Sequence, residues 1–173
     1  MAETPQKPID DQLNEQHIWK ALKDVPDPEL PAISVIDMGI VRRIDVDAER
    51  SHIRVEITPT FSGCPALLQI QQSILAHLSS LATDVEVIVS MREPWTSDLL
   101  SEDARRKLHG VGIAPPPKVG RGRIIPMLIS RPLTCPHCGS QQTVLENAFG
   151  PTPCRAIAYC NQCHQPFEQF KPI

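Results

Sequence analysis

Hydrophobic and polar residues alternate in three short stretches of the first half of the chain. One stretch contains Ile44 and Val46, the second covers residues 53–57 and the third covers residues 85–89. Because successive side chains of a β-strand point to opposite faces of a sheet, this alternation predicts three strands that each bury one face. The polar residues 47–50 form a connection of hairpin length, so we expect the first two strands to pair antiparallel.

A different periodicity fills the interval between the second and third strands. Apolar residues recur at helical spacing over residues 65–81, which predicts an amphipathic helix. A strand, a helix and a strand in succession favour a right-handed crossover, which makes the second and third strands parallel. Shorter helices are predicted from a cap at Asp10 or Asp11 to about Leu22, and over residues 101–110. The expected fold class is therefore α/β (α+β), with a small, helix-covered mixed sheet.

Changes in composition divide the chain into four parts. Residues 1–9 are polar, contain two prolines and are expected to form a mobile tail, and residues 10–110 contain the predicted α/β domain. Residues 111–131 are rich in proline and glycine and are interpreted as a linker to a small module at 132–173. Three prolines within residues 25–31 exclude a helix there, but composition does not decide whether this loop is ordered.

The overall composition limits which kinds of binding partner and which cellular location are expected. Hydrophobic residues make up 41% of the 173 residues, enough for a core in the larger domain. The formal net charge of -3 gives no basic surface for nucleic acid or an anionic membrane, and no apolar run approaches the roughly 20 residues that span a bilayer. The polar N-terminal residues lack the apolar core of a secretory signal. We therefore expect a cytoplasmic protein that binds neither nucleic acid nor membranes.

Four of the six cysteines occur as two Cys-x-x-Cys pairs in the C-terminal module. Cys135 and Cys138 form the first pair, Cys160 and Cys163 form the second, and 21 residues separate the pairs. In a reducing compartment such pairs are typical of metal sites, because each tight turn lets two sulfur atoms converge on one ion. Four thiolates complete the tetrahedral coordination of zinc, so we expect a zinc ribbon whose metal is structural.

Two questions stay open for this module. Four thiolates can also hold an iron–sulfur cluster, although the ribbon-like spacing favours zinc. Cys154 is a fifth thiol nearby, and His137 and His164 each stand beside a cysteine ligand. We expect both histidines to be exposed, and the sequence leaves undecided whether Cys154 joins the site.

Cys64 stands apart from the other cysteines, directly before Pro65. Proline suits the first position of a helix, so Cys64 is expected to be the N-cap of the helix that follows. There the helix dipole lowers the pKa of a thiol, which suits one that binds a metal or cluster transiently or attacks an electrophile. A small buried hydrophobic residue is the equally supported alternative. Asp27 and Glu29, in the proline-rich loop, are the nearest approach to a carboxylate pair, but loop carboxylates are more often solvated or capping.

Several of these segments resemble a known family. Residues 27–31, 35–41 and 58–65 resemble the MIP18-like domain, which is shared by SufT and the eukaryotic cytosolic iron–sulfur assembly factor. Further motifs make the whole chain similar to the PaaD (PaaJ) family within the bacterial phenylacetyl-CoA 1,2-epoxidase system. These motifs are residues 95–97, residues 112–116, the two Cys-x-x-Cys turns and residues 167–171.

The resemblance implies a role in aerobic phenylacetate catabolism. In that system a protein of this family is inferred to be an accessory subunit, not itself catalytic, that assists iron–sulfur cluster assembly or insertion in the reductase. The reactive cysteine of the family corresponds to Cys64, and its acidic loop to Asp27 and Glu29. The cofactors implied are a structural zinc and a transient iron or iron–sulfur cluster. The partners implied are the reductase and the oxygenase subunits, and a homo-oligomer is left open.

Two other functions compete with this one. A purely structural subunit that bridges oxygenase and reductase needs no reactive thiol. An enzyme that uses Cys64 as a nucleophile, for instance on a CoA thioester, needs a base and oxyanion donors. No such base can be named in the sequence around Cys64, so the enzyme is the least favoured of the three.

Overall fold

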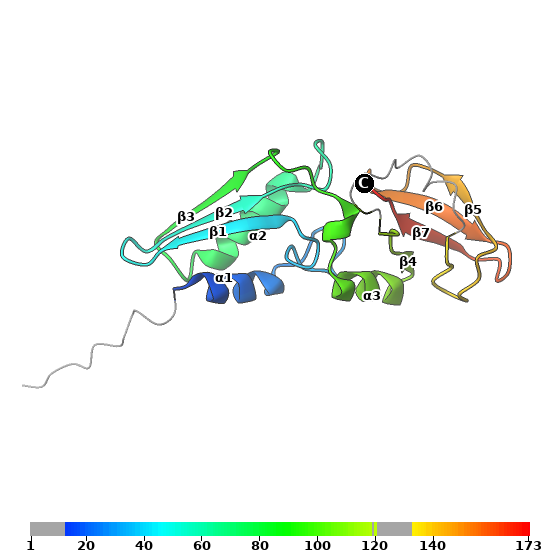
Figure 1. Ribbon diagram of the computed structural model, residues 1–173, viewed down its shortest axis with the longest axis horizontal. Helices are drawn as coiled ribbons and strands as arrows, with labels where there is room; N and C mark the ends of the chain where they lie inside the picture. Colours follow the sequence, from blue (N-terminus) through cyan, green and yellow to red (C-terminus); the bar gives the residue numbers. More distant parts are fainter. Residues whose placement is uncertain (1–12, 119, 121–132) are drawn as a thin grey trace, which may run out of the picture.

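The computed structural model describes residues 13–118, 120 and 133–173. Two lobes lie side by side along the long axis of the molecule, with the last helix between them (Figure 1). The predicted tail and most of the predicted linker lie outside the described residues. Within the described part of the chain, no helix is long and apolar enough to cross a membrane.

In chain order, the elements are α1 (Glu15–Ala21), the 3-10 turn η2 (Leu22–Asp24), β1 (Val41–Asp47), β2 (His52–Ile57), α2 (Leu67–Leu78), β3 (Asp84–Val89), the 3-10 turn η3 (Ser97–Leu99), α3 (Glu102–Gly110), β4 (Ile113–Ala114), β5 (Thr143–Asn147), β6 (Arg155–Cys160) and β7 (Pro166–Phe170).

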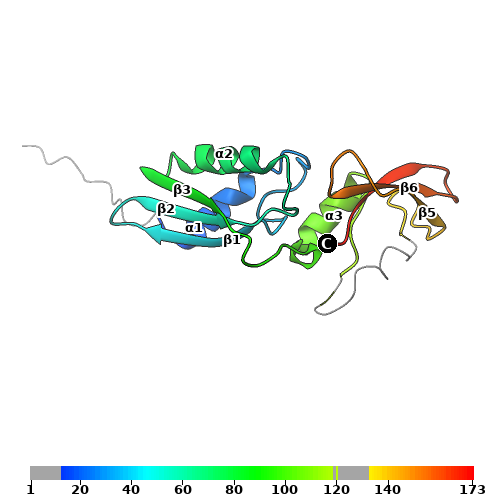
Figure 2. The same cartoon turned by 90° about the horizontal axis from the view of Figure 1, so that it is seen from above.

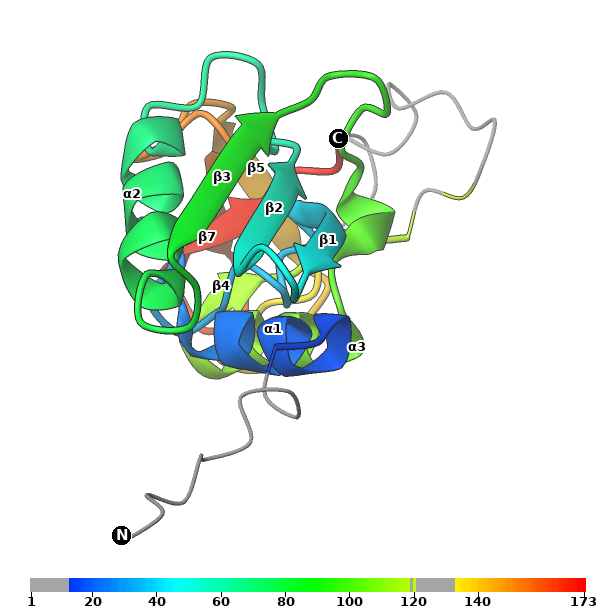
Figure 3. The same cartoon turned by 90° about the vertical axis from the view of Figure 1, so that its left-hand side faces the viewer.

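The N-terminal lobe contains the predicted three-stranded sheet, in the order β1-β2-β3. β1 and β2 pair antiparallel and β2 and β3 pair parallel, as the hairpin and the crossover predicted. Ile44, Val55 and Val87 are register neighbours on the face that packs into the core. Helices α1 and α2 lie on the same side of this sheet, and the opposite side carries polar pairs such as Arg54 and Glu86 (Figures 2 and 3).

Two helix starts differ from the prediction. The N-cap of α1 is Asn14, whose side chain accepts a hydrogen bond from the backbone N–H of His17 (2.9 Å), while Asp10 and Asp11 lie outside the described residues. α2 begins at Leu67 with Ala66 as its N-cap, so Cys64 is not the cap that we predicted. The residues between Cys64 and the helix form a turn instead. α3, by contrast, starts as expected at the side-chain cap of Ser101.

The proline-rich loop, whose order the sequence left open, is ordered. Its two ends form an isolated β-bridge between Pro26 and Ser34, and the backbone N–H of Asp27 donates to the carbonyl of Ile33 (2.8 Å). Leu30 and Ile33 are buried in the core. This packing fixes the acidic residues of the loop in one place.

The C-terminal lobe is a four-stranded sheet in the order β4-β7-β6-β5. β5, β6 and β7 pair antiparallel, and the short β4 pairs parallel with β7. β4 consists of Ile113 and Ala114, which lie inside the segment interpreted as a linker. The chain therefore contributes to the ribbon sheet directly after α3, and the residue ranges of the domains stay a prediction.

The two lobes share one hydrophobic core. Phe170 of β7 is fully buried against the first lobe, and its ring lies 5.9 Å from that of Trp95, centroid to centroid. The Trp95 indole N–H donates to the carbonyl of Met38 (2.8 Å), and the backbone N–H of Ser97 donates to the carbonyl of Ile173 (3.0 Å). The C-terminus accordingly ends near the middle of the molecule (Figure 1). These contacts hold the ribbon against the sheet domain.

Candidate functional site

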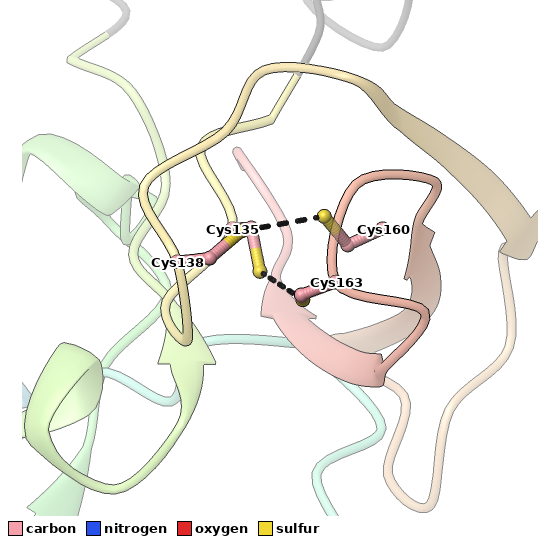
Figure 4. Close-up of side chains that lie close together, drawn as sticks. All are labelled: Cys135, Cys138, Cys160 and Cys163. Atoms are coloured by element: carbon pink, nitrogen blue, oxygen red, sulfur yellow. Dashed lines mark hydrogen bonds between the residues drawn. The ribbon is translucent and has the colours of Figure 1, made fainter.

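The four predicted cysteine ligands converge at one end of the ribbon (Figure 4). Cys135 and Cys138 lie in the turn before β5, while Cys160 ends β6 and Cys163 follows it. All four sulfur atoms lie within 4.8 Å of one another. The Sγ atoms of Cys135 and Cys163 are 3.7 Å apart, and those of Cys138 and Cys160 are 3.6 Å apart. A tetrahedron of thiolates at the usual zinc–sulfur bond length has edges of about 3.8 Å, so the quartet fits one ion.

Both turns of the quartet are built in the same way. In the first, the N–H of Gly139 donates to the carbonyl of Cys135 (2.9 Å), and Gly139 has a φ of +74°. In the second, the N–H of His164 donates to the carbonyl of Cys160 (2.9 Å), and His164 has a φ of +57°. The left-handed residue after the second cysteine reverses the chain, which aims both sulfur atoms of each pair inward. His137 and His164 are exposed, as predicted.

Backbone N–H groups lower the pKa of one of these thiols, which favours the binding of a cation. The N–H groups of Cys163 and, to a lesser extent, Gln162 donate to the sulfur of Cys160 and lower its pKa to about 6, although burial opposes this. A thiol with that pKa is largely a thiolate at neutral pH, the form that binds metals. The pKa values of Cys138 and Cys163 are raised instead, so Cys160 is the ready anionic ligand, and the other two lose their protons when a cation binds.

The isolated Cys64 lies at the junction of the two lobes, in the turn that leads into α2. Its side chain is half-buried and packs against the shared core. Its pKa is raised, first by burial and then by the charges of Glu29, Asp27 and Cys154, although the backbone N–H of Ala66 opposes this. The prediction of a lowered pKa was wrong, because Cys64 is not the N-cap and its surroundings are both buried and acidic.

The two acidic residues of the proline-rich loop are brought toward Cys64. Asp27 is only 5% exposed, and its Oδ1 accepts hydrogen bonds from the backbone N–H groups of Glu29 and Leu30, both at 2.9 Å. Burial raises the pKa of Asp27 and of Glu29, and the charge of Asp27 raises that of Glu29 further. Asp27 therefore caps its own loop and fixes the backbone of Glu29.

The ribbon contributes two residues to this junction that the sequence pattern did not indicate. Cys154 is 6% exposed, and its Sγ lies 4.0 Å from Oε2 of Glu29. Arg155 lowers the pKa of Asp27, Glu29 and Cys154, and it pairs with Glu168 at 2.7 Å. The sequence relates Cys154 only to the nearby metal quartet. Its spacing gives no signal for the junction, because Glu29 is 125 residues away.

An open groove of about 530 Å³ runs beside this junction. The proline-rich loop lines one side with Glu29, Leu30 and Ile33, and the ribbon lines the other with His137, Arg155 and Glu168. Glu29 thus faces both the groove and Cys154. The groove gives solvent a route to the acidic part of the junction.

Two family models match separate parts of the chain. Residues 15–89 match the family described as iron-sulfur cluster assembly protein, and residues 129–171 match the PaaD zinc beta ribbon domain. The sheet domain is similar to the Fe-S protein maturation auxiliary factor SufT of Staphylococcus aureus (strain USA300), with 36% identity over 47% of this chain and 92% of that protein. It is also similar to the crystal structure of a domain of unknown function, DUF59, from Bacillus anthracis. That match has a TM-score of 0.51 and 29% identity, and covers 54% of this chain and 90% of the other.

One relative spans both lobes. It is a protein of Escherichia coli (strain K12) assigned as a subunit of 1,2-phenylacetyl-CoA epoxidase, and it is 36% identical over 157 residues, which cover 90% of this chain and 92% of that protein. A match of this length is too long to lie within either lobe alone. The chain therefore belongs to the PaaD family of phenylacetyl-CoA epoxidase subunits, with an MIP18-like sheet domain followed by a PaaD zinc ribbon.

Proposed function

We propose that this protein assists the assembly or insertion of the iron–sulfur cluster in the reductase of a phenylacetyl-CoA epoxidase system. Cys64 is the thiol that handles iron or a nascent cluster, and Asp27 and Glu29 assist it. The observation that carries this proposal is the arrangement at the lobe junction, where a half-buried thiol shares its surroundings with two carboxylates. That arrangement occurs within a domain that matches iron-sulfur cluster assembly proteins and resembles a maturation factor.

The electrostatics of the junction support binding over catalysis. Because burial and acidic neighbours raise the pKa of Cys64, its thiol is mostly protonated at neutral pH and is a weak nucleophile by itself. A cation changes this balance, since a metal ion displaces the thiol proton when it binds. The protein is accordingly an accessory factor and not the catalytic component, and it acts in the cytoplasm, where the reductase is assembled.

The cysteine quartet has a separate role in this proposal. Four thiolates around one ion leave no open coordination position, so the metal is structural. Sulfur separations of 3.6 and 3.7 Å support a single tetrahedral ion, because a cluster places several iron atoms between its thiolates and needs wider spacing. In this proposal that ion is zinc. The zinc holds the ribbon in the shape that docks against the sheet domain.

The test replaces Cys64 with serine in cells that co-express the reductase. We expect the iron and acid-labile sulfide per reductase to fall well below the wild-type level, while zinc in the variant itself stays at one ion per chain. Ser62→Ala is the matched control, because Ser62 is an exposed residue of the same turn. Unchanged cluster loading together with full epoxidase activity in the Cys64→Ser strain would refute the proposed role.

A structural bridging role is the second candidate. Leu68 of α2 and Phe149 after β5 are 71% and 78% exposed, so each lobe offers a bridging partner one apolar side chain. This function predicts stable, stoichiometric co-purification with oxygenase and reductase. It also predicts that Cys64→Ser leaves cluster loading unaffected, so the same experiment separates the two candidates.

A further inference from the structure

The junction of the lobes brings together four potential metal ligands from three separate segments. The proline-rich loop supplies Asp27 and Glu29, the turn before α2 supplies Cys64, and the residue before β6 supplies Cys154. Cys154 Sγ lies 4.0 Å from Glu29 Oε2 and 3.2 Å from the hydroxyl of Thr152. Cys64 is within electrostatic range of Glu29, Asp27 and Cys154. Each lobe thus contributes one thiol to the same acidic surroundings.

These surroundings are short of positive charge. Burial raises the pKa of both thiols and both carboxylates, so ionising them together is unfavourable without a cation. Arg155 supplies some positive charge, but its guanidinium already pairs with Glu168 and with the hydroxyl of Thr152. A divalent cation at this place offsets part of the negative charge that the four groups carry when they lose their protons.

The ligand types indicate which cation fits. Two thiolates with a carboxylate are a mixed soft and hard set, which suits Fe(II), Co(II) or Zn(II) and disfavours Mg(II) or Ca(II). We propose that Cys154 is a second thiol ligand of the Cys64 site, so that a thiophilic divalent cation binds between the lobes to Cys64, Cys154 and Glu29. This inference rests on the proposed cluster-handling role of Cys64 and assigns part of that site to the ribbon.

The ribbon fixes the position of Cys154 through β6. Cys154, Ala156, Ala158 and Cys160 are all buried, so they lie along one face of the strand, with the lobe junction at one end and the metal quartet at the other. The backbone N–H of Lys171 donates to the carbonyl of Cys154 (2.9 Å), which ties it to the end of β7. Zinc in the quartet therefore supports the second site by ordering this strand. Asp27 acts as a positioning residue, because it holds the backbone of Glu29.

The second site is not preassembled. Among the described residues, the ribbon quartet is the group of three or more ligands whose atoms all lie within 4.8 Å of one another. Cys64, Cys154 and Glu29 must therefore move together around an ion, and the cost of ordering them lowers the affinity. A site that closes around its ion and reopens suits a cation that is passed on, whereas the rigid quartet suits one that stays.

The test is a titration with Co(II) of full-length protein that carries one zinc ion per chain, in the quartet, and the readout is the sulfur-to-cobalt charge-transfer absorption. Co(II) binds such sites more weakly than zinc, so the quartet keeps its zinc. A separate metal-free sample given one equivalent of Co(II) calibrates the intensity of four thiolates. We expect wild-type protein to bind one further Co(II) with about half that intensity, since two of the four thiolate bonds are present. Cys154→Ser and Cys64→Ser should each weaken this binding at least about tenfold.

Control variants distinguish a failure of the proposed Cys64–Cys154 pairing from a failure of the proposed role of Cys64. Glu29→Gln should weaken the second site, whereas Glu49→Gln, which changes a carboxylate in the β1–β2 connection, should not. If Cys154→Ser binds Co(II) with wild-type affinity and intensity while Cys64→Ser does not, the pairing is refuted and the role of Cys64 stands. If wild-type protein binds no second ion, the pairing is refuted, and the cluster loading of the reductase in the Cys64→Ser strain decides the proposed function separately. If Cys154→Ser loses its zinc or no longer unfolds cooperatively, its affinity for Co(II) is not a fair comparison with wild type. The charge-transfer intensity of the wild-type protein then decides, because an intensity that corresponds to one thiolate refutes the pairing of Cys64 with Cys154.

Discussion

Substitution of Phe170 by alanine tests whether the two lobes unfold as one unit. The side chain of Phe170 is 0% exposed, belongs to the core of the first lobe and contacts the ring of Trp95, although its backbone belongs to the ribbon strand β7. Phe170→Ala removes this packing and leaves a cavity at the junction. Such substitutions cost about 3–5 kcal/mol, and the lost contact between the rings accounts for about 0.5–1.5 kcal/mol of that.

The lower end of this range applies if the lobes can move together to fill the cavity. A loss of about 3 kcal/mol in the free energy of unfolding corresponds to a decrease of about 6–12 °C in Tm for a chain of this size. Urea and thermal unfolding followed by circular dichroism measure the change. Phe149→Ala is the matched control in the same lobe, since that ring is 78% exposed and contacts only the ammonium of Lys171 among the ring contacts of the described residues. Its expected cost is about 1 kcal/mol or less.

A clear result would refute this reasoning. If Phe170→Ala lost less than about 1 kcal/mol, or no more than Phe149→Ala, Phe170 could not be part of a core shared by both lobes. The ribbon would then be an independent module, and the position of Cys154 beside Glu29 would not be maintained in solution. The measurement therefore also tests the geometric basis of the second cation site.

Three further predictions follow from particular contacts. Gly39→Ala should destabilise the protein by more than about 1 kcal/mol, because Gly39 has a φ of +68° and an added Cβ would lie 2.6 Å from the carbonyl oxygen of Leu99. Gly110→Ala is the control, since nothing lies within 4 Å of its added Cβ, and its stability should be unchanged or higher by up to about 1 kcal/mol. Thermal unfolding of both variants measures the difference. Removal of the ribbon metal by a chelator should unfold the C-terminal lobe, which loss of its amide hydrogen-exchange protection would reveal; full protection without metal would contradict a structural role. Burial raises the pKa of Asp37, but its hydrogen bond and ion pair with Lys107 (2.8 Å), together with its hydrogen bonds to Ser34, outweigh burial and lower that pKa below its ordinary 3.8. The pair therefore stabilises the fold above pH 3.8 and is lost as the pH falls below it, so Asp37→Asn should be less stable than wild type at neutral pH and the difference should shrink in acid urea titrations.

The sequence by itself determined the local architecture. Alternation at Ile44, Val55 and Val87 predicted three strands, and the helical periodicity between the last two predicted their parallel pairing. The two Cys-x-x-Cys turns predicted the quartet, because each tight turn brings its own two sulfur atoms together and a tetrahedral ion needs both pairs. Each of these predictions starts from a local pattern, in which backbone geometry limits the outcomes.

Only the tertiary structure decided the environment of the isolated thiol. The sequence placed Cys64 at a helix N-cap with a lowered pKa, whereas the helix begins three residues later and burial beside Glu29 raises the pKa. The order of the proline-rich loop and the docking of Phe170 depend on contacts between distant segments, as does the approach of Cys154 to Glu29. A pKa is set by every charge and every buried surface around the group, so it follows from the packing of the two lobes and not from the residues next to it in the chain.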